Sequence, residues 1–292
     1  MAILFLPLAL GAVLPSAQAA KVAVFAGNYG PERSVFSEWA NKYGLATEVY
    51  AFWDQAQMEQ VLENLDQYEA LIVGTNVVRD GLYQIFMDHR DDIRQWVEGG
   101  GRLVVLGQFN GETTGGQDAY EWLEVFGIGR GPQNWGNDIG WLKAGDPVFQ
   151  GVTEQELEAT TWTDGNNYWS TLEILDGHPD AGKWEVLAKN DVGDVLMARG
   201  KFGKGMVLVT SWQIGNAEEA NGHWEGGEWV WDPAPGPFAR LFSNSLDYVY
   251  THGGRKPVPA PGLLDALVAG ALMLSLLGVM SRPRVAKGSM KA

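Results

Sequence analysis

Short apolar runs alternate with amphipathic runs through the first half of the chain, and this alternation constrains the fold more than any other feature. The apolar runs lie at residues 21–26 (KVAVFA), 47–52, 70–74 (ALIVG) and 102–107 (RLVVLG). Helical patterns separate them at residues 31–43, 54–65 and 82–98. Asp54 is expected to cap the second helix. Uninterrupted apolarity is typical of strands that are buried on both faces. The first half therefore predicts a mostly parallel, flavodoxin-like α/β sheet with helices on both faces.

The second half predicts an antiparallel extension of this sheet. Strand-like runs lie at residues 184–189, 194–199 and 206–211. The first two are joined by Asn190-Asp191-Val192-Gly193, which is a hairpin-type turn. Further helices are expected at residues 118–126 and 237–250, whereas residues 217–237 show no periodicity and are expected to form a long loop.

The amino terminus has the pattern of a secretory signal peptide. An apolar stretch ends at Pro15, and Ala17-Gln18-Ala19 supplies the small residues that signal peptidase accepts. Residues 1–19 are therefore expected to direct export through the Sec translocon and to be removed by signal peptidase. The alternative is an uncleaved anchor helix. Either outcome places residues 20–252, the predicted α/β domain, outside the cytoplasm.

The carboxyl terminus has the pattern of a membrane anchor. Its apolar stretch, residues 263–281, is long enough to cross a bilayer as one helix, because about 18 residues at roughly 1.5 Å each nearly match the hydrocarbon core. Arg282 and Arg284 follow directly, as expected for the cytoplasmic side of a membrane. We therefore predict one transmembrane helix and a basic cytoplasmic tail at residues 282–292.

A short proline motif precedes this stretch within the linker at residues 253–262. Val258 is followed by Pro259, Ala260 and Pro261. The motif, the apolar helix and the basic end together resemble the sorting signal of PEP-CTERM proteins. That resemblance implies an exosortase as a partner, with cleavage at the proline motif. Ala260 stands where the family has Glu, and this departure weakens the inference of cleavage more than that of membrane association.

Composition excludes several classes of function. The formal net charge is −15, and an acidic body repels the phosphate backbone of nucleic acids. The chain contains no Cys, so it has no thiol nucleophile, no thiolate metal site and no disulfide.

Three short sequence segments resemble those of a known family of domains. They are residues 96–107 (WVEGGGRLVVLG), 146–152 (DPVFQGV) and 200–207 (GKFGKGMV). They are similar to segments of class I glutamine-amidotransferase-like domains, including the ThuA-like group. The resemblance extends over about residues 21–250 and implies an amidotransferase-like fold.

In that family the strand after the glycine-rich phrase leads into a nucleophile elbow, Gly-x-Cys-x-Gly. The matching positions here are Gly107, Gln108, Phe109, Asn110 and Gly111. Phe109 cannot attack a carbonyl, so glutaminase chemistry is excluded and no catalytic residue is assigned. The alternative is that the two glycines only terminate a buried strand.

No metal or cofactor is predicted. None of the four His has the spacing of a paired metal ligand. His89 lies among Asp88, Asp91 and Asp92, but adjacent residues of a helix point in different directions, so a solvated helix face is favoured over a metal site. Asp164 begins a sequence typical of a turn, with a calcium loop as the alternative.

The expected ligand site combines residues at strand ends with tryptophans of the second half. Ligands of α/β sheets bind at the carboxyl ends of the strands. The residues expected to bind a ligand are Asn28, Tyr29, Asn76, Gln108, Asn110, Trp212, Gln213, Trp224 and Trp229. Indole rings beside amides favour a polysaccharide ligand. Two alternatives stay open: the tryptophans pack loops onto the sheet, or the domain is a sugar-processing enzyme that uses Asp164, Glu225 or Glu228.

Overall fold

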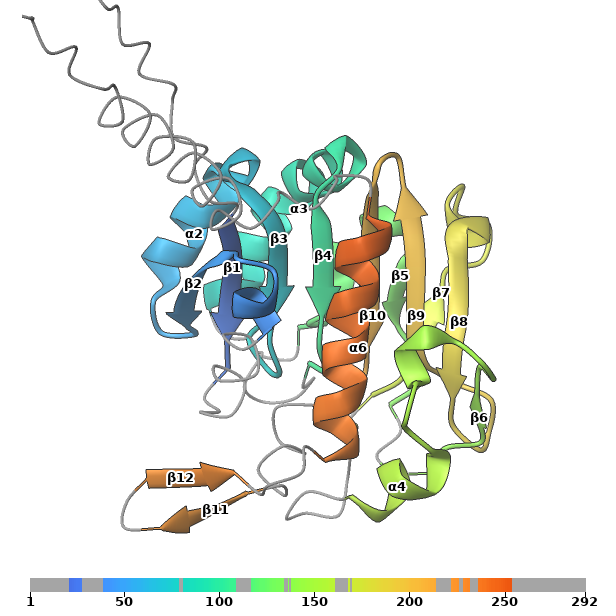
Figure 1. The fold of residues 1–292 in the computed structure, drawn as a ribbon. Coiled ribbons are helices and arrows are strands. Elements are labelled where there is room, and N and C mark those ends of the chain that lie inside the picture. The colour runs from blue at the N-terminus through green and yellow to red at the C-terminus, as the bar shows by residue number, and fades with distance from the viewer. Residues whose placement is uncertain are drawn as a thin grey trace, which may run out of the picture. The chain divides into compact units, whose positions relative to one another are not determined.

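A mixed β-sheet runs through the centre of the computed structural model (Figure 1). The structure describes residues 21–27, 39–78, 81–108, 117–133, 136, 138–160, 168, 170–213, 222–225, 228–231 and 236–253. Within these residues the strands of the sheet are β1 (Lys21–Ala26), β2 (Ala46–Ala51), β3 (Tyr68–Val73), β4 (Arg102–Val105), β5 (Ile128–Arg130), β6 (Trp141–Leu142), β7 (Leu172–Ile174), β8 (Trp184–Lys189), β9 (Val195–Phe202) and β10 (Gly205–Thr210). Their order is β2-β1-β3-β4-β10-β9-β7-β5, with β8 paired to β9 and β6 paired to β8.

The first half of the sheet is parallel, as its apolar runs predict. β1 pairs in parallel with β2 and β3, and β4 pairs in parallel with β3 and β10. Successive residues of β1 enter opposite cores: Val22 and Val24 join one cluster, whereas Ala23 and Phe25 join the other. A strand that faces a core on both sides must be apolar at every position, which explains its uninterrupted pattern.

The second half is antiparallel, which confirms the predicted extension. β9 pairs antiparallel with β8, β10 and β7. The turn between β8 and β9 is the predicted one, closed by a hydrogen bond from Asp194 N to Asn190 Oδ1 (2.7 Å). Gly193 supplies a positive φ of 96° in this turn, a conformation that glycine adopts without steric cost.

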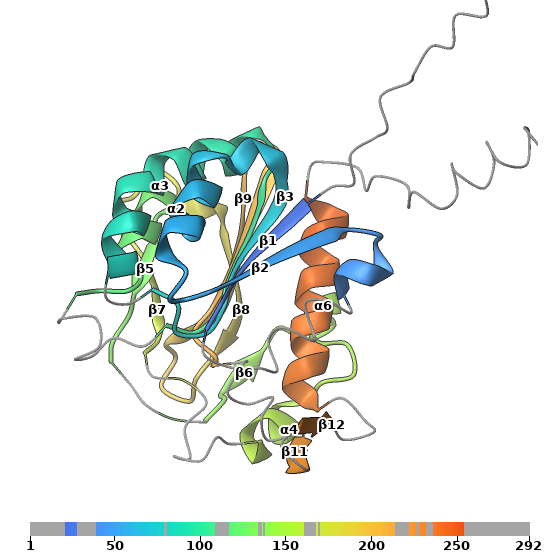
Figure 2. The ribbon, with the colours of Figure 1, turned by 90° about the vertical axis from the view of Figure 1, so that its left-hand side faces the viewer.

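Helices cover both faces of the sheet (Figure 2). Figure 2 shows α2 (Gln55–Glu63) and α3 (Gly81–Gly99) on one face, and α6 (Pro237–His252) on the other. The helix α4 (Glu154–Ala159) is short, and the 3₁₀ helices are η1 (Leu65–Gln67), η3 (Glu121–Phe126), η4 (Pro147–Phe149) and η5 (Ala181–Lys183). Phe86 and Val97 of α3 belong to one core, and Leu241 and Leu246 of α6 belong to the other.

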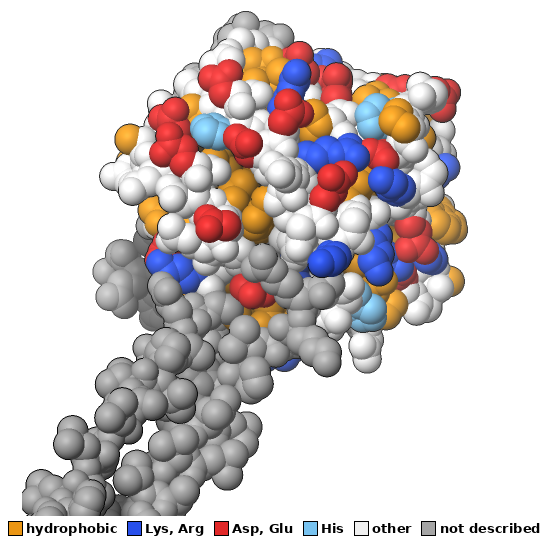
Figure 3. Space-filling view, turned by 90° about the horizontal axis from the view of Figure 1, so that it is seen from above, with side chains coloured by type: hydrophobic (Ala, Val, Ile, Leu, Met, Phe, Trp, Pro, Cys, Tyr) orange, Lys and Arg blue, Asp and Glu red, His pale blue; other side chains and the backbone are white. Residues whose placement is uncertain are grey.

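The face at the amino ends of the parallel strands carries both signs of charge. Figure 3 shows Lys and Arg side chains interspersed with Asp and Glu on this face. Asp180, beside η5, pairs with Arg94 of α3 at 2.6 Å and with Lys183 at 2.5 Å. Asp180 thus neutralises part of the positive charge on this face.

Three local predictions differ from the structure. The Asp54 side chain does not cap α2, because its Oδ2 accepts from Ala51 N (3.1 Å) instead. The helix predicted at residues 118–126 is the 3₁₀ helix η3, where the Asp118 carboxylate bonds Tyr120 N and begins the segment as a tight turn. Residues 217–237 contain a hairpin of β11 (Gly222–Glu225) and β12 (Glu228–Trp231) rather than only a loop.

The predictions for the chain ends lie outside the described residues. This applies to the signal peptide at 1–19, the transmembrane helix at 263–281 and the basic tail. Among the residues that the structure describes, no helix is long and apolar enough to cross a membrane. Only the last part of the helix predicted at residues 31–43 is described, and residues 39–42 are helical.

A buried ion pair fixes the position of the segment at residues 146–152. Arg199 of β9 donates to both carboxylate oxygens of Asp146, at 2.9 and 2.8 Å. Asp146 Oδ1 also accepts from Val148 N (3.1 Å), which starts η4. The Arg199 guanidinium lies 4.0 Å from the ring centroid of Tyr248 in α6 and also donates to Glu185. One arginine therefore holds the segment after β6, the sheet and α6 together.

We predict that Asp146→Asn lowers the free energy of unfolding by about 3 kcal/mol, because it leaves a buried guanidinium without its bidentate partner. Urea unfolding followed by circular dichroism measures this loss. Glu185→Gln is the matched control. It removes a more exposed carboxylate from the same Arg199 and should cost below about 1 kcal/mol. Equal losses for the two variants would contradict this role of Arg199.

Candidate functional site

The residues that follow β3, β4 and β10 meet at the carboxyl edge of the sheet. Asn76 N donates to Gly107 O (2.9 Å), and Gly107 N donates to Trp212 O (2.9 Å). Backbone pairing thus continues beyond the three strands. The predicted site residues Asn76, Gln108, Trp212 and Gln213 are brought to this edge, but they differ in what they can offer a ligand.

All the hydrogen-bonding groups of the Gln108 side-chain amide are bonded to other groups of the protein. Its Oε1 accepts from Val77 N and Val78 N, both at 2.9 Å. Its Nε2 donates to Gly74 O (2.8 Å) and Leu106 O (2.7 Å). An amide has two acceptor positions and two donors, so none is left for a ligand. The side chain is also 1% exposed. The prediction that Gln108 binds a ligand is therefore replaced by a structural role.

Gly107 is required by close packing between two strand ends. A Cβ atom at this position would lie 2.5 Å from Ser211 O and 2.7 Å from Trp212 O, which are backbone atoms that cannot move aside. This contact supports the alternative in which the glycine terminates a buried strand. The other members of the degenerate elbow, Phe109, Asn110 and Gly111, lie outside the described residues.

Asn76 has the features of a ligand-binding residue. Its backbone has a φ of 55°, the left-handed conformation that is uncommon for residues other than glycine. The side chain is 8% exposed, and its Oδ1 has no hydrogen-bond partner among the described residues. A buried acceptor without a partner costs free energy. A ligand that donates a hydrogen bond at this position would remove that cost.

Trp212 is part of the core. Its side chain is 0% exposed and packs edge-to-face on Phe238 at 6.0 Å between ring centroids. The indole face is therefore not available for stacking on a sugar, contrary to its predicted role. Gln213 is buried as well.

The described tryptophans mostly support the packing alternative. Buried positions are Trp39, Trp96, Trp122, Trp184 and Trp212. Trp53 and Trp141 are 58% and 42% exposed, respectively. These buried indole rings therefore do not form the tryptophan-rich ligand surface that the sequence predicts.

The hairpin β11–β12 contains Trp224 and Trp229 as register partners. Glu225 and Glu228 are also register partners, and Gly226 and Gly227 separate them in the sequence. Two glycines between strand-like residues are a hairpin signal that the sequence analysis missed. Of the other predicted site residues, Asn28, Tyr29 and Asp164 lie outside the described part of the chain.

Asp118 is a carboxyl group beside this edge that the sequence analysis did not assign to the site. Burial raises its pKa, and the nearby Glu121 charge adds to the increase, whereas a hydrogen bond from Tyr120 N opposes it. The Tyr120 hydroxyl in turn accepts from Gln108 N (2.8 Å), which connects this segment to the end of β4. A carboxyl with a raised pKa is a candidate functional group, but sequence spacing offered no signal for it.

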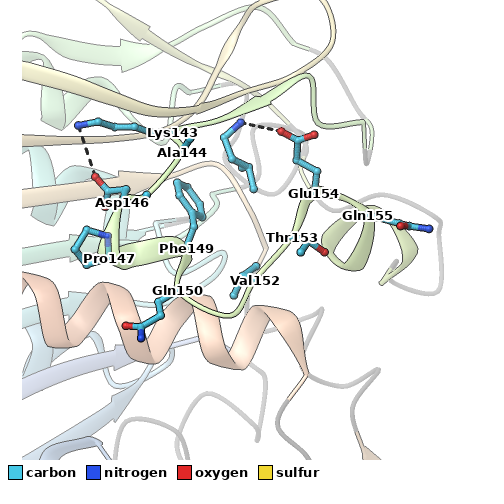
Figure 4. Close-up of a pocket in the computed structure, with 12 residues that line it drawn as sticks. Lys143, Ala144, Asp146, Pro147, Phe149, Gln150, Val152, Thr153, Glu154 and Gln155 are labelled. Atoms are coloured by element: carbon cyan, nitrogen blue, oxygen red, sulfur yellow. Dashed lines mark hydrogen bonds and ion pairs between the residues drawn. The ribbon is translucent and has the colours of Figure 1, made fainter.

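The pocket of about 700 Å³ beside β6 is lined by one segment, residues 142–155. Figure 4 shows its polar side chains engaged with the segment itself: Lys143 points to Asp146, and Glu154 accepts from Leu142 N (3.1 Å). Arg240 of α6 donates to Gly151 O (3.0 Å). The charged groups around this hollow hold the loop in place, so it is not the favoured site.

Potential metal ligands do not gather in the described part of the chain. No group of three or more His, Asp or Glu side chains there could hold a metal ion. His89 Nδ1 lies 3.4 Å from Asp92 on one turn of α3.

The comparisons with known proteins found matches among solved structures. No family model and no curated protein matches the sequence. Similar solved structures include a Thermoplasma acidophilum protein described as one of the subunits of GMP synthase, with 11% identity and a TM-score of 0.43 over 80% of this chain and 96% of that chain. A Bacteroides uniformis protein described as ThuA-like has 14% identity and a TM-score of 0.41, over 83% and 97%. A glutamine amidotransferase from Methylobacillus flagellatus has 11% identity and a TM-score of 0.42, over 82% and 96%.

The mixed sheet, with helices on both faces and the glycine-terminated β4 at its centre, fits an amidotransferase-like fold. Similarity at this level concerns the fold alone, so the function of the site depends on its own residues.

We predict that Gln108→Met lowers the free energy of unfolding by about 3 kcal/mol, since it leaves buried backbone groups of Val77, Val78 and Gly74 without partners. Urea unfolding measures the change. Gln150→Met, at an exposed position, is the control and should change stability by less than about 0.5 kcal/mol. A stable Gln108→Met protein would instead make this side chain a candidate for ligand binding again.

Proposed function

We propose that this chain is an exported cell-envelope protein whose amidotransferase-like domain binds a ligand and does not hydrolyse glutamine. Asn76 carries the proposal for binding. Its left-handed backbone lies at the carboxyl edge, where ligands of α/β sheets bind, and its buried Oδ1 has no hydrogen-bond partner among the described residues. The chain contains no Cys, so the thiol chemistry of glutaminases has no nucleophile.

The proposal for localisation rests on the two ends of the sequence. A signal peptide at residues 1–19 would direct export through the Sec translocon, and the helix at 263–281 would retain the protein in the membrane. The motif at Pro259, Ala260 and Pro261 supports sorting by an exosortase, with release at the cell surface after cleavage.

A matrix polysaccharide is the proposed ligand. Its hydroxyl groups are hydrogen-bond donors, and the described residues supply no donor to the Asn76 Oδ1. The tryptophan-rich second half, including Trp224 and Trp229, supports the same class of ligand. The alternative is a sugar-processing enzyme that uses Asp164, Glu225 or Glu228, whose side chains lie outside the described part of the structure.

We predict that Asn76→Gly weakens binding of a soluble bacterial exopolysaccharide about tenfold without loss of stability. Glycine keeps the left-handed backbone and removes only the amide, and one hydrogen bond is worth about 1.4 kcal/mol. Titration monitored by tryptophan fluorescence measures the affinity. Asn76→Ala should weaken binding equally but also cost about 1 kcal/mol in stability, because a Cβ disfavours this backbone. Unchanged affinity in Asn76→Gly would remove Asn76 from the site.

We expect sorting to depend on an exosortase. In cells that lack the enzyme, the protein should stay in the membrane fraction at a larger apparent mass than in cells that have it. Fractionation followed by immunoblotting measures this difference. Exchange of Pro259 and Pro261 for Ala should reproduce the larger form in cells that contain the enzyme. One membrane-bound species of unchanged size in every sample would indicate a plain anchor.

A further inference from the structure

A second polar cavity lies at the opposite edge of the sheet from the antiparallel strands. It has a volume of about 300 Å³ and is lined by residues of the edge strand β2, the helix α2 and η1. Figure 1 shows β2 and α2 as neighbours. We call it the edge groove, defined by Glu48 and Tyr50 of β2, Gln57 and Gln60 of α2, and Gln67 and Tyr68 at η1 and β3. Its size is at the lower end of the range of small-molecule sites, about 300–1,000 Å³.

One wall of the edge groove is a row of uncharged amides. Gln57, Gln60 and Asn64 are three and four residues apart, so they share one face of α2. The charged residues of this helix, Glu59 and Glu63, do not line the groove. Solvated helix faces usually carry charges, whereas a row of amides presents donors and acceptors without charge.

The amides differ in how much hydrogen-bonding capacity remains. Asn64 Nδ2 donates to Gln60 O (2.8 Å), which fixes its position. The side chains of Gln57 and Gln60 make no hydrogen bond to another described residue and are exposed. Each therefore presents two donors and an acceptor to the groove.

The other wall contains the Glu48 carboxylate, whose negative charge is already paired with Lys21. Glu48 Oε1 pairs with Lys21 Nζ at 2.8 Å, and Oε2 accepts from the Tyr50 and Tyr68 hydroxyls at 3.0 and 2.7 Å. Hydrogen bonds from Lys21 and Tyr68 hold the pKa of Glu48 below its ordinary value. Because each tyrosine hydroxyl donates its hydrogen to Glu48, it can only accept from a ligand.

These two walls define the chemistry of an occupant. A phosphate or other anion would find no unpaired cation in the lining and would face Glu48. A metal cation would find one carboxylate, which Lys21 already neutralises. An apolar molecule would find mainly polar side chains beside Val61. A neutral molecule rich in hydroxyl groups fits, because it donates to the tyrosine oxygens and exchanges hydrogen bonds with the amides.

We propose that the edge groove is a binding site for a neutral saccharide. Gln57 and Gln60 bond its hydroxyl groups in both directions, and the hydroxyls of Tyr50 and Tyr68 accept from it. This site is separate from the carboxyl edge. It stands on the contacts of α2, β2 and Glu48 alone, so it does not require that Asn76 bind a ligand or that the protein be exported.

Saturation-transfer-difference NMR on the full-length protein tests the proposal. The probes are the neutral tetrasaccharides of glucose, mannose and xylose, and the anionic trigalacturonate serves as the charged probe. Any detergent must lack a sugar headgroup, since such a headgroup would compete for the site. We expect transfer to at least one neutral probe, with a dissociation constant in the millimolar range, and none to trigalacturonate.

The double variant Gln57→Ala, Gln60→Ala should weaken that binding at least tenfold. Alanine favours the helix, so α2 should stay folded, which thermal unfolding by circular dichroism can verify. Gln95→Ala, an exposed glutamine of α3 outside the groove, should leave binding unchanged. The same loss is expected when the double variant made in the Asn76→Gly background is compared with Asn76→Gly alone, in a protein whose carboxyl edge lacks its amide, which separates this site from the carboxyl edge.

Three results would each overturn the proposal: no transfer to any neutral probe, equal transfer to trigalacturonate, or full binding by the double variant. The last result would indicate a ligand held by the exposed backbone of β2 rather than by the amides. Tyr50→Phe provides a second variant, because it removes one acceptor while Lys21 and Tyr68 still hold Glu48. It should weaken binding by a smaller factor than the double variant.

Discussion

The amide of Gln108 lies where β3, β4 and the turn after β3 meet, and it bonds to all of them. Its carbonyl accepts from Val77 and Val78, and its NH₂ group donates to Gly74 and Leu106. These bonds satisfy backbone groups that the strands leave unpaired where they end. They also set the path of the turn that presents Asn76. The geometry of the carboxyl edge therefore depends on one buried side chain.

This arrangement explains why neighbouring residues at one edge differ in role. The Gln108 side chain makes its hydrogen bonds within the protein, and the Trp212 ring packs on Phe238. Asn76 has a strained backbone and an acceptor without a partner among the described residues. Strain and unsatisfied polar groups commonly mark functional positions. They destabilise the folded state, so they persist mainly where a function requires them. The edge is thus a structural junction at which the Asn76 Oδ1 can accept a hydrogen bond from a ligand.

The parallel half of the fold was predictable because its strands are buried on both faces. Val22 to Phe25 alternate between two cores, so apolarity alone revealed β1. Local signals also located the β8–β9 turn. Local signals gave the wrong prediction at two positions. The Asp54 side chain bonds Ala51 and does not cap α2, and η3 forms as a 3₁₀ helix and not as an α-helix. The adjacent Gly226 and Gly227 are a sequence signal of the hairpin that periodicity did not detect.

The sequence by itself determined the parallel sheet, the loss of thiol chemistry and the expectation of export, because these follow from apolar periodicity, from composition and from the two chain ends. Only the tertiary structure decided which polar residues are free to bind. A glutamine after a strand has the same sequence pattern whether it faces a ligand or the backbone of its neighbours. The Gln108 partners Val77, Val78 and Gly74 lie in a segment distant in the chain, as does Lys21, the partner of Glu48. No local pattern could therefore reveal these contacts.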